Sequence, residues 1–141
     1  MSQLKYITVP NFISEKGNAY KGITLSYQLF GEVLHSAPVV LVNHALTGNS
    51  DVASENGWWK AIVGDGKLID TTKYTVLAFD IPSNGYETNE IVYGYDEFSA
   101  HDIANLFGLA IKQLQISKIY AAIGSSLGEV LLGKWLYCFR N

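Results

Sequence analysis

The sequence has few of the residues that build disulfides, metal sites or nucleic-acid surfaces. A single cysteine, Cys138, excludes an internal disulfide and fits a reducing compartment. The three histidines, His35, His44 and His101, do not have the spacing of metal ligands. The ten lysines and arginines form no basic run and the net charge is −3, so nothing in the sequence would neutralise a phosphate backbone. We therefore expect no metal and no nucleic-acid partner.

Long apolar runs are missing as well. No stretch approaches the ~20 residues that a membrane-spanning helix needs, and residues 1–10 contain no signal-peptide core. Hydrophobic residues nevertheless make up 48% of the chain and charged residues 16%, which is typical of a globular protein. The length of 141 residues favours one domain or part of one. We therefore expect a globular cytoplasmic protein with no membrane partner.

Short apolar runs and one amphipathic stretch indicate an α/β fold. Residues 39–42, 74–79 and 118–123 are continuous apolar runs, typical of strands buried on both faces. A capping box, Ser99 with Asp102, precedes a helical apolar face made by Ile103, Leu106, Phe107, Ala110, Ile111 and Leu114. Buried strands that alternate with helical segments predict a mostly parallel sheet with crossover helices.

Two further segments complete the expected architecture. Residues 23–29 alternate apolar and polar side chains, which predicts a strand with one covered face. This strand would form an antiparallel hairpin with residues 3–9 at the edge of the sheet. Residues 57–69 are expected to form a short helix and a loop, with Trp58 and Trp59 as packing residues.

The stretch from residue 118 to residue 135 has the pattern of a nucleophile elbow. An apolar run leads into G-S-S-L-G, and a helix-like segment follows. In a strand–turn–helix context, G-x-S-x-G places a serine hydroxyl above the end of a sheet, next to backbone N–H groups. Ser126, between Gly124 and Gly128, is the predicted nucleophile. The alternative is a strand–helix loop that merely uses small residues.

A second motif lies about 80 residues upstream. The strand over 39–42 ends in N-H-A-L-T-G, a small and polar loop at the carboxyl end of a strand. In this fold, one oxyanion donor comes from such a loop and the other is the N–H of the residue after the nucleophile.

These motifs together resemble the homoserine O-acetyltransferase family of α/β-hydrolase-fold acyltransferases. The resemblance rests on N-H-A-L-T-G, on G-W-W-K-A-I-V-G-D-G-K-L-I-D-T, on Y-T-V-L-A-F-D followed by I-P-S-N-G-Y, and on G-S-S-L-G. It implies transfer of an acetyl group from acetyl-CoA, as co-substrate, to L-homoserine through an acyl-serine, in methionine biosynthesis. Carried over, Ser126 is the nucleophile, and the N–H groups of Leu46 and Leu127 form the oxyanion hole. No bound cofactor is implied.

The sequence departs from the family pattern in two ways. The family elbow usually reads Gly-Gly-Ser-x-Gly-Gly, whereas Ser125 and Glu129 stand at two of the glycine positions. The triad acid and histidine follow the serine in this fold, but the 15 residues after Ser126 contain no Asp and no His. We therefore interpret residues 1–141 as a single incomplete domain, the N-terminal portion of an α/β-hydrolase fold, which is inactive or nearly so alone. Its open sheet edge predicts self-association.

Other candidate residues are assigned structural roles. We expect His44 to hydrogen-bond backbone rather than to act as the base, and Asp80 to brace its loop rather than to act as the triad acid. His101 is expected to be exposed, His35 to lie in a surface turn, and Cys138 to be a small core residue.

Two alternative functions remain open at this stage. One is a related esterase or another O-acyltransferase of the same fold. The other, of a different class, is a non-catalytic remnant or a fragment that binds a partner through the open edge.

Overall fold

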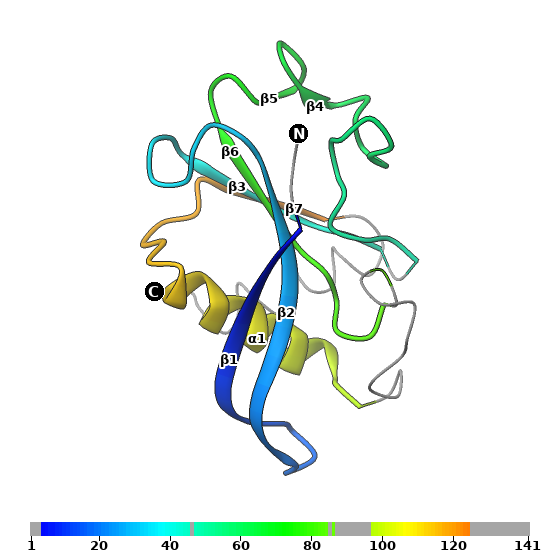
Figure 1. Cartoon of the computed structure of the whole chain (residues 1–141), viewed down its shortest axis with the longest axis vertical. Coiled ribbons are helices and arrows are strands. Elements are labelled where there is room, and N and C mark those ends of the chain that lie inside the picture. Colours follow the sequence, from blue (N-terminus) through cyan, green and yellow to red (C-terminus); the bar gives the residue numbers. More distant parts are fainter. Residues whose placement is uncertain (1–3, 46, 85, 87–96, 125–141) are drawn as a thin grey trace.

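The computed structural model describes residues 4–45, 47–84, 86 and 97–124. Along the chain lie β1 (Lys5–Ile13), β2 (Ala19–Gly31), β3 (Val39–Asn43), β4 (Val63–Gly64), β5 (Ile69–Asp70), β6 (Thr75–Phe79), α1 (Ala100–Gln113) and β7 (Ala121–Gly124). Five strands form one sheet in the order β1-β2-β6-β3-β7, and β4 pairs with β5 in a separate two-stranded sheet. Figure 1 shows α1 lying across one face of the large sheet.

The parallel centre of the sheet is confirmed. All five residues of β3 and all five of β6 are buried. The two strands run parallel with Leu41 opposite Leu77, and β7 runs parallel to β3 with Asn43 opposite Gly124. Strands buried on both faces need apolar side chains throughout, which is why their sequences read as continuous apolar runs. The third strand begins three residues later than predicted, at Ala121.

The antiparallel edge is also confirmed, with β1 paired to β2 and β2 paired to β6. Only Tyr27–Gly31 of β2 meets β6, so the rest of the hairpin extends beyond the sheet and over α1 (Figure 1). The prediction that one face of β2 is covered was wrong at two positions. Ser26 and Gln28 are 6% and 4% exposed, because polar groups of the neighbouring loops cover them.

Alternate residues of β3 and β6 belong to two apolar cores, one on each face of the sheet. On one face, Leu41, Leu77 and Phe79 pack against α1, where the rings of Phe79 and Phe107 stack at 5.0 Å. On the other face lies a smaller core made by Phe30, Val40, Val42, Val52, Val63, Ile69, Val76 and Ala78. The sheet is thus covered on both sides along β3 and β6. The prediction of a third strand buried on both faces was wrong, because all four residues of β7 are half-buried.

The predicted capping box of α1 is present. The Ser99 hydroxyl accepts the N–H of Asp102 at 3.0 Å, and the Asp102 carboxylate accepts the N–H of Ser99 at 3.1 Å. The same carboxylate accepts the N–H of Glu15 at 2.9 Å. One side chain therefore begins the helix and joins it to the end of the hairpin.

The helix expected within residues 57–69 is absent, and turns with the short strands β4 and β5 occupy the segment. Gly57 lies so close to the preceding turn that a Cβ there would be 2.5 Å from the Val52 carbonyl oxygen. Gly64 and Gly66 interrupt the remainder. The tryptophans pack as predicted: Trp58 and Trp59 stack at 4.9 Å against the smaller core.

Candidate active site

The carboxyl ends of β3, β6 and β7 meet at one edge of the sheet because the three strands are parallel. In open α/β sheets this edge carries the ligand sites. Two loops lie at this edge of the sheet. The loop after β3 (residues 44–50) contains the predicted oxyanion donor, and the loop after β6 covers residues 80–84. Gly124, the last residue of β7, lies directly opposite Asn43.

His44 joins the two loops through both of its ring nitrogens. Its Nε2 accepts the backbone N–H of Ile81 at 2.9 Å, and its Nδ1 lies 2.5 Å from the carbonyl oxygen of Ala45. The side chain is 1% exposed. Burial lowers the pKa of the imidazole, and the Ala45 carbonyl and the charge of Asp80 oppose this only in part. The expectation of backbone hydrogen bonding is confirmed, and neither nitrogen is left to act as a base.

Asp80, the first residue of the loop after β6, joins the same two loops through Ser50, at the end of the loop that His44 begins. Its Oδ1 accepts the N–H of Ser50 at 2.7 Å and the Asn84 amide at 2.9 Å. Its Oδ2 accepts the hydroxyls of Ser26 at 2.7 Å and of Ser50 at 2.6 Å. All four donors are neutral, and the carboxylate is 2% exposed. The bracing role predicted for Asp80 is confirmed.

The loop over residues 44–50 is tied down at its far end as well. The Ser50 hydroxyl accepts the Gln28 amide at 3.0 Å, and the same amide nitrogen donates to the Tyr86 hydroxyl at 3.3 Å. The indole of Trp58 donates to the Asn49 carbonyl at 2.8 Å. These bonds hold Asn49 and Ser50, at the described end of the loop, in place before a substrate binds. Groups fixed in advance are what oxyanion stabilisation requires.

Asn43 carries a buried acceptor at this edge. The residue is 1% exposed, and its side-chain oxygen has no hydrogen-bond partner among the residues that the structure describes. Buried polar atoms are nearly always paired. Its position opposite Gly124 places Asn43 at the point where β7 leads into the glycine–serine segment.

The three residues with predicted catalytic roles, Leu46, Ser126 and Leu127, lie outside the described residues, as do Ser125, Glu129 and Cys138. Their predicted roles therefore stay predictions. The structure does place the strand that leads to Ser126, and both flanks of Leu46, at the same edge of the sheet.

The other two histidines lie away from this edge. His35 is exposed, with a φ of 74°, in the loop between β2 and β3, as predicted. His101 is half-buried in the first turn of α1, less exposed than expected. Sequence reasoning missed Ser26, Gln28 and Ser50 as partners of the Asp80 cluster. The only signal for Ser26 and Gln28 was a polar face on β2, which also fits plain solvent exposure, and Ser50 gave none beyond its place in the loop after β3.

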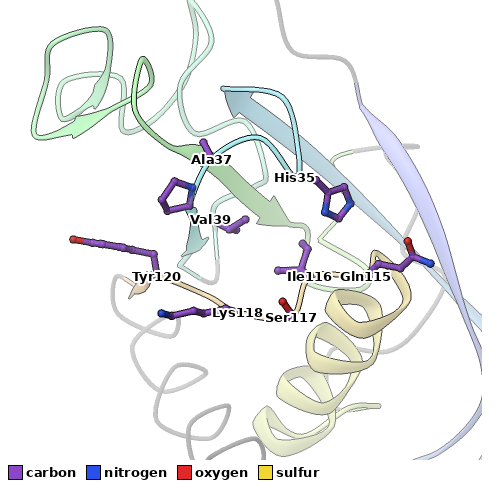
Figure 2. Close-up of a pocket in the computed structure, with 9 residues that line it drawn as sticks. His35, Ala37, Val39, Gln115, Ile116, Ser117, Lys118 and Tyr120 are labelled. Carbon is purple, nitrogen blue, oxygen red and sulfur yellow. The ribbon is translucent and has the colours of Figure 1, made fainter.

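A surface pocket of about 380 Å³ lies at the opposite end of the sheet (Figure 2). It adjoins Val39, the first residue of β3, and Tyr120, which precedes β7. Figure 2 shows Lys118 and Tyr120 on one side of the view and His35 and Gln115 on the other. Its place at the amino ends of the strands separates it from the edge that carries His44 and Asp80.

Residues 38–128 match the family model described as alpha/beta hydrolase fold. The chain belongs to the alpha/beta hydrolase fold family. This confirms the predicted fold, and the core of parallel strands described above agrees with it.

Relatives with known names support the predicted resemblance. Homoserine O-acetyltransferase of Carboxydothermus hydrogenoformans is 28% identical over 97% of this chain and 41% of its own length. Homoserine O-acetyltransferase FUB5 of Gibberella moniliformis is 30% identical over 93% of this chain and 31% of its own. This alpha/beta hydrolase chain therefore spans about two fifths or less of these relatives.

Solved structures give the same picture. Homoserine O-acetyltransferase from Staphylococcus aureus is similar with a TM-score of 0.85 and 29% identity, over 99% of this chain and 43% of that one. Esterase E22 has a TM-score of 0.81 and 26% identity, over 99% and 45%. Among the described residues of this alpha/beta hydrolase, no helix is long and apolar enough to cross a bilayer, and no three His, Cys, Asp or Glu side chains gather to hold a metal.

Proposed function

We propose that this chain is the N-terminal part of a homoserine O-acetyltransferase-like enzyme of methionine biosynthesis in the cytoplasm. The observation that carries the proposal is the double bracing of residues 44–50, by His44 and by Asp80, beside the strand that leads into G-S-S-L-G. The names of the relatives support the choice of an acyltransferase over a general hydrolase.

In the proposed reaction, the Ser126 hydroxyl attacks the thioester carbonyl of acetyl-CoA and loses its proton to a histidine base. The carbonyl carbon becomes tetrahedral, and its oxyanion is bound by the N–H groups of Leu46 and Leu127. The C–S bond then breaks, CoA leaves as the protonated thiol, and Ser126 carries the acetyl group. The hydroxyl of L-homoserine attacks this ester next, and Ser126 recovers its proton as O-acetylhomoserine leaves.

The base and its acid partner would come from beyond residue 141. An α/β-hydrolase supplies them after the serine, and none of the last 15 residues is Asp or His. On this proposal the 141-residue chain has little or no acyl-transfer activity alone, since removal of the base abolishes most of the activation of the serine. The outer edge of β7 has no partner strand among the described residues, and we propose that it mediates self-association.

A second candidate is an esterase of the same fold. Its support is the similarity to esterase E22, because the same nucleophile and oxyanion groups would serve when water replaces the amino-acid acceptor. A third, non-catalytic candidate is a fragment that binds a partner through β7.

The first test is the nucleotide sequence beyond codon 141, read in all three frames. A downstream frame that encodes further α/β elements with an Asp and then a His supports the proposal. The protein from that frame should release at most one equivalent of CoA per chain from acetyl-CoA alone and turn over continuously only with L-homoserine present, and Ser126→Ala should abolish both. Acetyl-ester hydrolysis without an acceptor would favour the esterase. Absence of any such frame would overturn the catalytic proposal and favour the partner-binding fragment.

A further inference from the structure

The pocket at the amino ends of β3 and β7 has an apolar floor. Val39 and Ile116 form this floor; they are 5% and 7% exposed and belong to the core that packs against α1. Figure 2 shows them between the two polar sides of the pocket. The volume of about 380 Å³ lies within the range of small-molecule sites. The pocket can therefore hold a small molecule with an apolar body.

The polar groups around this floor favour a negatively charged ligand. The described residues that line the pocket include no carboxylate, although the chain has 13 acidic residues. Four polar side chains of the lining make no hydrogen bond or ion pair within the described part of the chain: those of His35, Gln115, Ser117 and Lys118. A lysine ammonium group with no ion-pair partner is suited to bind an anion.

Lys118 and Tyr120 form one side of the pocket. They lie two residues apart in the segment that leads into β7, and Figure 2 shows their side chains extending in the same direction. The Tyr120 ring lies 5.2 Å from the ring of Tyr74, and a hydrogen bond with the Tyr120 hydroxyl raises the pKa of Tyr74. Tyr74 therefore keeps its proton and donates it, so the hydrogen of the Tyr120 hydroxyl remains for another acceptor. An ammonium group and a phenol together suit the two oxygens of a carboxylate.

Gln115, on the opposite side, has a backbone conformation that favours glycine. Its φ is 60°, its N–H donates to the Lys112 carbonyl at 2.9 Å, and the N–H of Ile116 donates to the Ile111 carbonyl at 3.1 Å. These two bonds end a helix on a left-handed residue, which is usually glycine because glycine has no Cβ. A glutamine here strains the helix end, yet it supplies a side chain to the wall of the pocket.

The strain at this pocket is not confined to Gln115. His35, which also lines it, has a φ of 74°. Two of the four described non-glycine residues with positive φ thus lie around this one pocket. Residues held in such conformations gather at functional sites, where the position of the side chain compensates for the strain.

We propose that this pocket is a binding site for a small carboxylate with an apolar body. The carboxylate accepts hydrogen bonds from the Lys118 ammonium and the Tyr120 hydroxyl, and the body lies on the floor of the pocket against Gln115. The site is at the opposite end of the sheet from His44 and Asp80. The proposal does not rest on the proposed acyl transfer, since binding can be measured on the 141-residue chain without any activity.

The first experiment is an NMR titration of the labelled chain with benzoate and with benzamide, its neutral counterpart of the same shape. Benzoate should shift the amide signals of Val39 and Ser117 along a saturable curve, with a Kd of about 1 mM for so small a probe. The signal of Ser50, at the other edge of the sheet, should stay in place. Benzamide should bind about three- to ten-fold more weakly, because it lacks the charge. No saturable shift at Val39 and Ser117, or equal binding of the two probes, would overturn the proposal.

Two lysine variants test the role assigned to Lys118. Lys118→Gln should weaken benzoate binding about three- to ten-fold and leave benzamide binding unchanged. Lys21→Gln removes an exposed lysine of β2 outside the pocket lining and is the matched control for net charge. An equal effect of the two variants on benzoate would show that general electrostatics, and not a site at Lys118, attracts the anion.

Gln115→Gly separates a binding role from a structural one. Glycine relieves the strain at the end of α1, so the midpoint of thermal unfolding should rise by roughly 2–6 °C. The same change removes part of the wall, so benzoate should bind about three-fold more weakly. A variant that is more stable and binds benzoate as well as the wild type would refute the role of Gln115 in the site.

Discussion

Ser50 gives Asp80 two hydrogen bonds, from its backbone N–H to Oδ1 at 2.7 Å and from its hydroxyl to Oδ2 at 2.6 Å. This paired contact closes the loop after β3 against the end of β6. Because His44 closes the other end of the same loop, the segment that holds the predicted oxyanion donor is anchored on both sides.

Asp80→Asn tests the bracing carboxylate. Four neutral donors surround the carboxylate, so an NH₂ group in place of one oxygen faces hydrogen-bond donors instead of accepting from them. We expect the free energy of unfolding in urea to fall by about 2–4 kcal/mol. Ser26→Ala, which removes only one of the four bonds, should cost about 1–2 kcal/mol. A loss for Asp80→Asn no greater than for Ser26→Ala would contradict the role assigned to the carboxylate.

The buried imidazole of His44 predicts a loss of stability in acid. Burial lowers its pKa in the folded state, whereas in the unfolded state the pKa lies near its ordinary value of about 6.5. Above that pH both states are neutral and the stability is full. As pH falls below it, the unfolded state binds the proton first, so the free energy of unfolding falls by up to about 1.4 kcal/mol per pH unit.

The check for His44 is a set of urea unfolding curves at several pH values from about 7.5 to 5. His44→Gln should flatten this part of the pH profile, and the exposed His35→Gln should leave it as in the wild type. A wild-type profile that His44→Gln does not change would refute the assignment of the acid sensitivity to His44.

Substitutions at two glycines with positive φ distinguish the cost of backbone strain from the cost of a steric clash. Gly31 (φ 85°) and Gly17 (φ 88°) share a backbone conformation, but a Cβ at Gly31 would lie 2.4 Å from the Tyr74 carbonyl oxygen, and one at Gly17 would meet nothing within 4 Å. Gly17→Ala should lower the free energy of unfolding by about 1 kcal/mol from backbone strain alone. Gly31→Ala should lower it by at least about 2 kcal/mol more, since a clash is added. Equal losses in thermal unfolding would argue against the close packing at Gly31.

The outer edge of β7 predicts concentration-dependent association. The N–H of Tyr120 donates to the Val39 carbonyl, and alternate residues of a strand face the same neighbour, so the N–H of Ala121 faces outward. Ala121→Pro removes that outward donor and keeps the ladder to β3, and it should shift sedimentation velocity towards monomer. Ala122→Pro is the contrasting variant, because it removes an inward donor and should destabilise the fold. Wild-type chain that stays monomeric at high concentration would exclude association through this edge.

The sequence predicted those elements in which burial alone sets the pattern of apolar residues. The run V-V-L-V of β3 has no polar position because both faces are buried, and α1 shows its apolar face because only one side packs on the sheet. β4 and β5 have two residues each and therefore no period to detect. The polar side chains of Ser26 and Gln28 follow the alternation of a solvent-facing strand, yet they are buried because Asp80 and Ser50 satisfy them.

The candidate site was predictable to the level of the loop but not of its bonds. The motif N-H-A-L-T-G marked the segment, and we expected its histidine, His44, to hydrogen-bond backbone. That the donor to Nε2 is the N–H of Ile81, 37 residues from His44 along the chain, depends on how the ends of β3 and β6 are brought together. Only the parallel register of the two strands supplies that information.

The link between Glu15 and Asp102 has a consequence for synthesis on the ribosome. The hairpin of β1 and β2 is made first, but the helix that covers its apolar side chains, such as Phe12 and Ile23, follows 87 residues later, the separation of that hydrogen bond. At ribosomal speeds of about 5–20 residues per second, that interval lasts roughly 4–17 seconds. During this time the apolar side chains of the nascent segment have no covering helix, and because an isolated two-stranded hairpin is only marginally stable in water, we expect its final pairing to wait for α1.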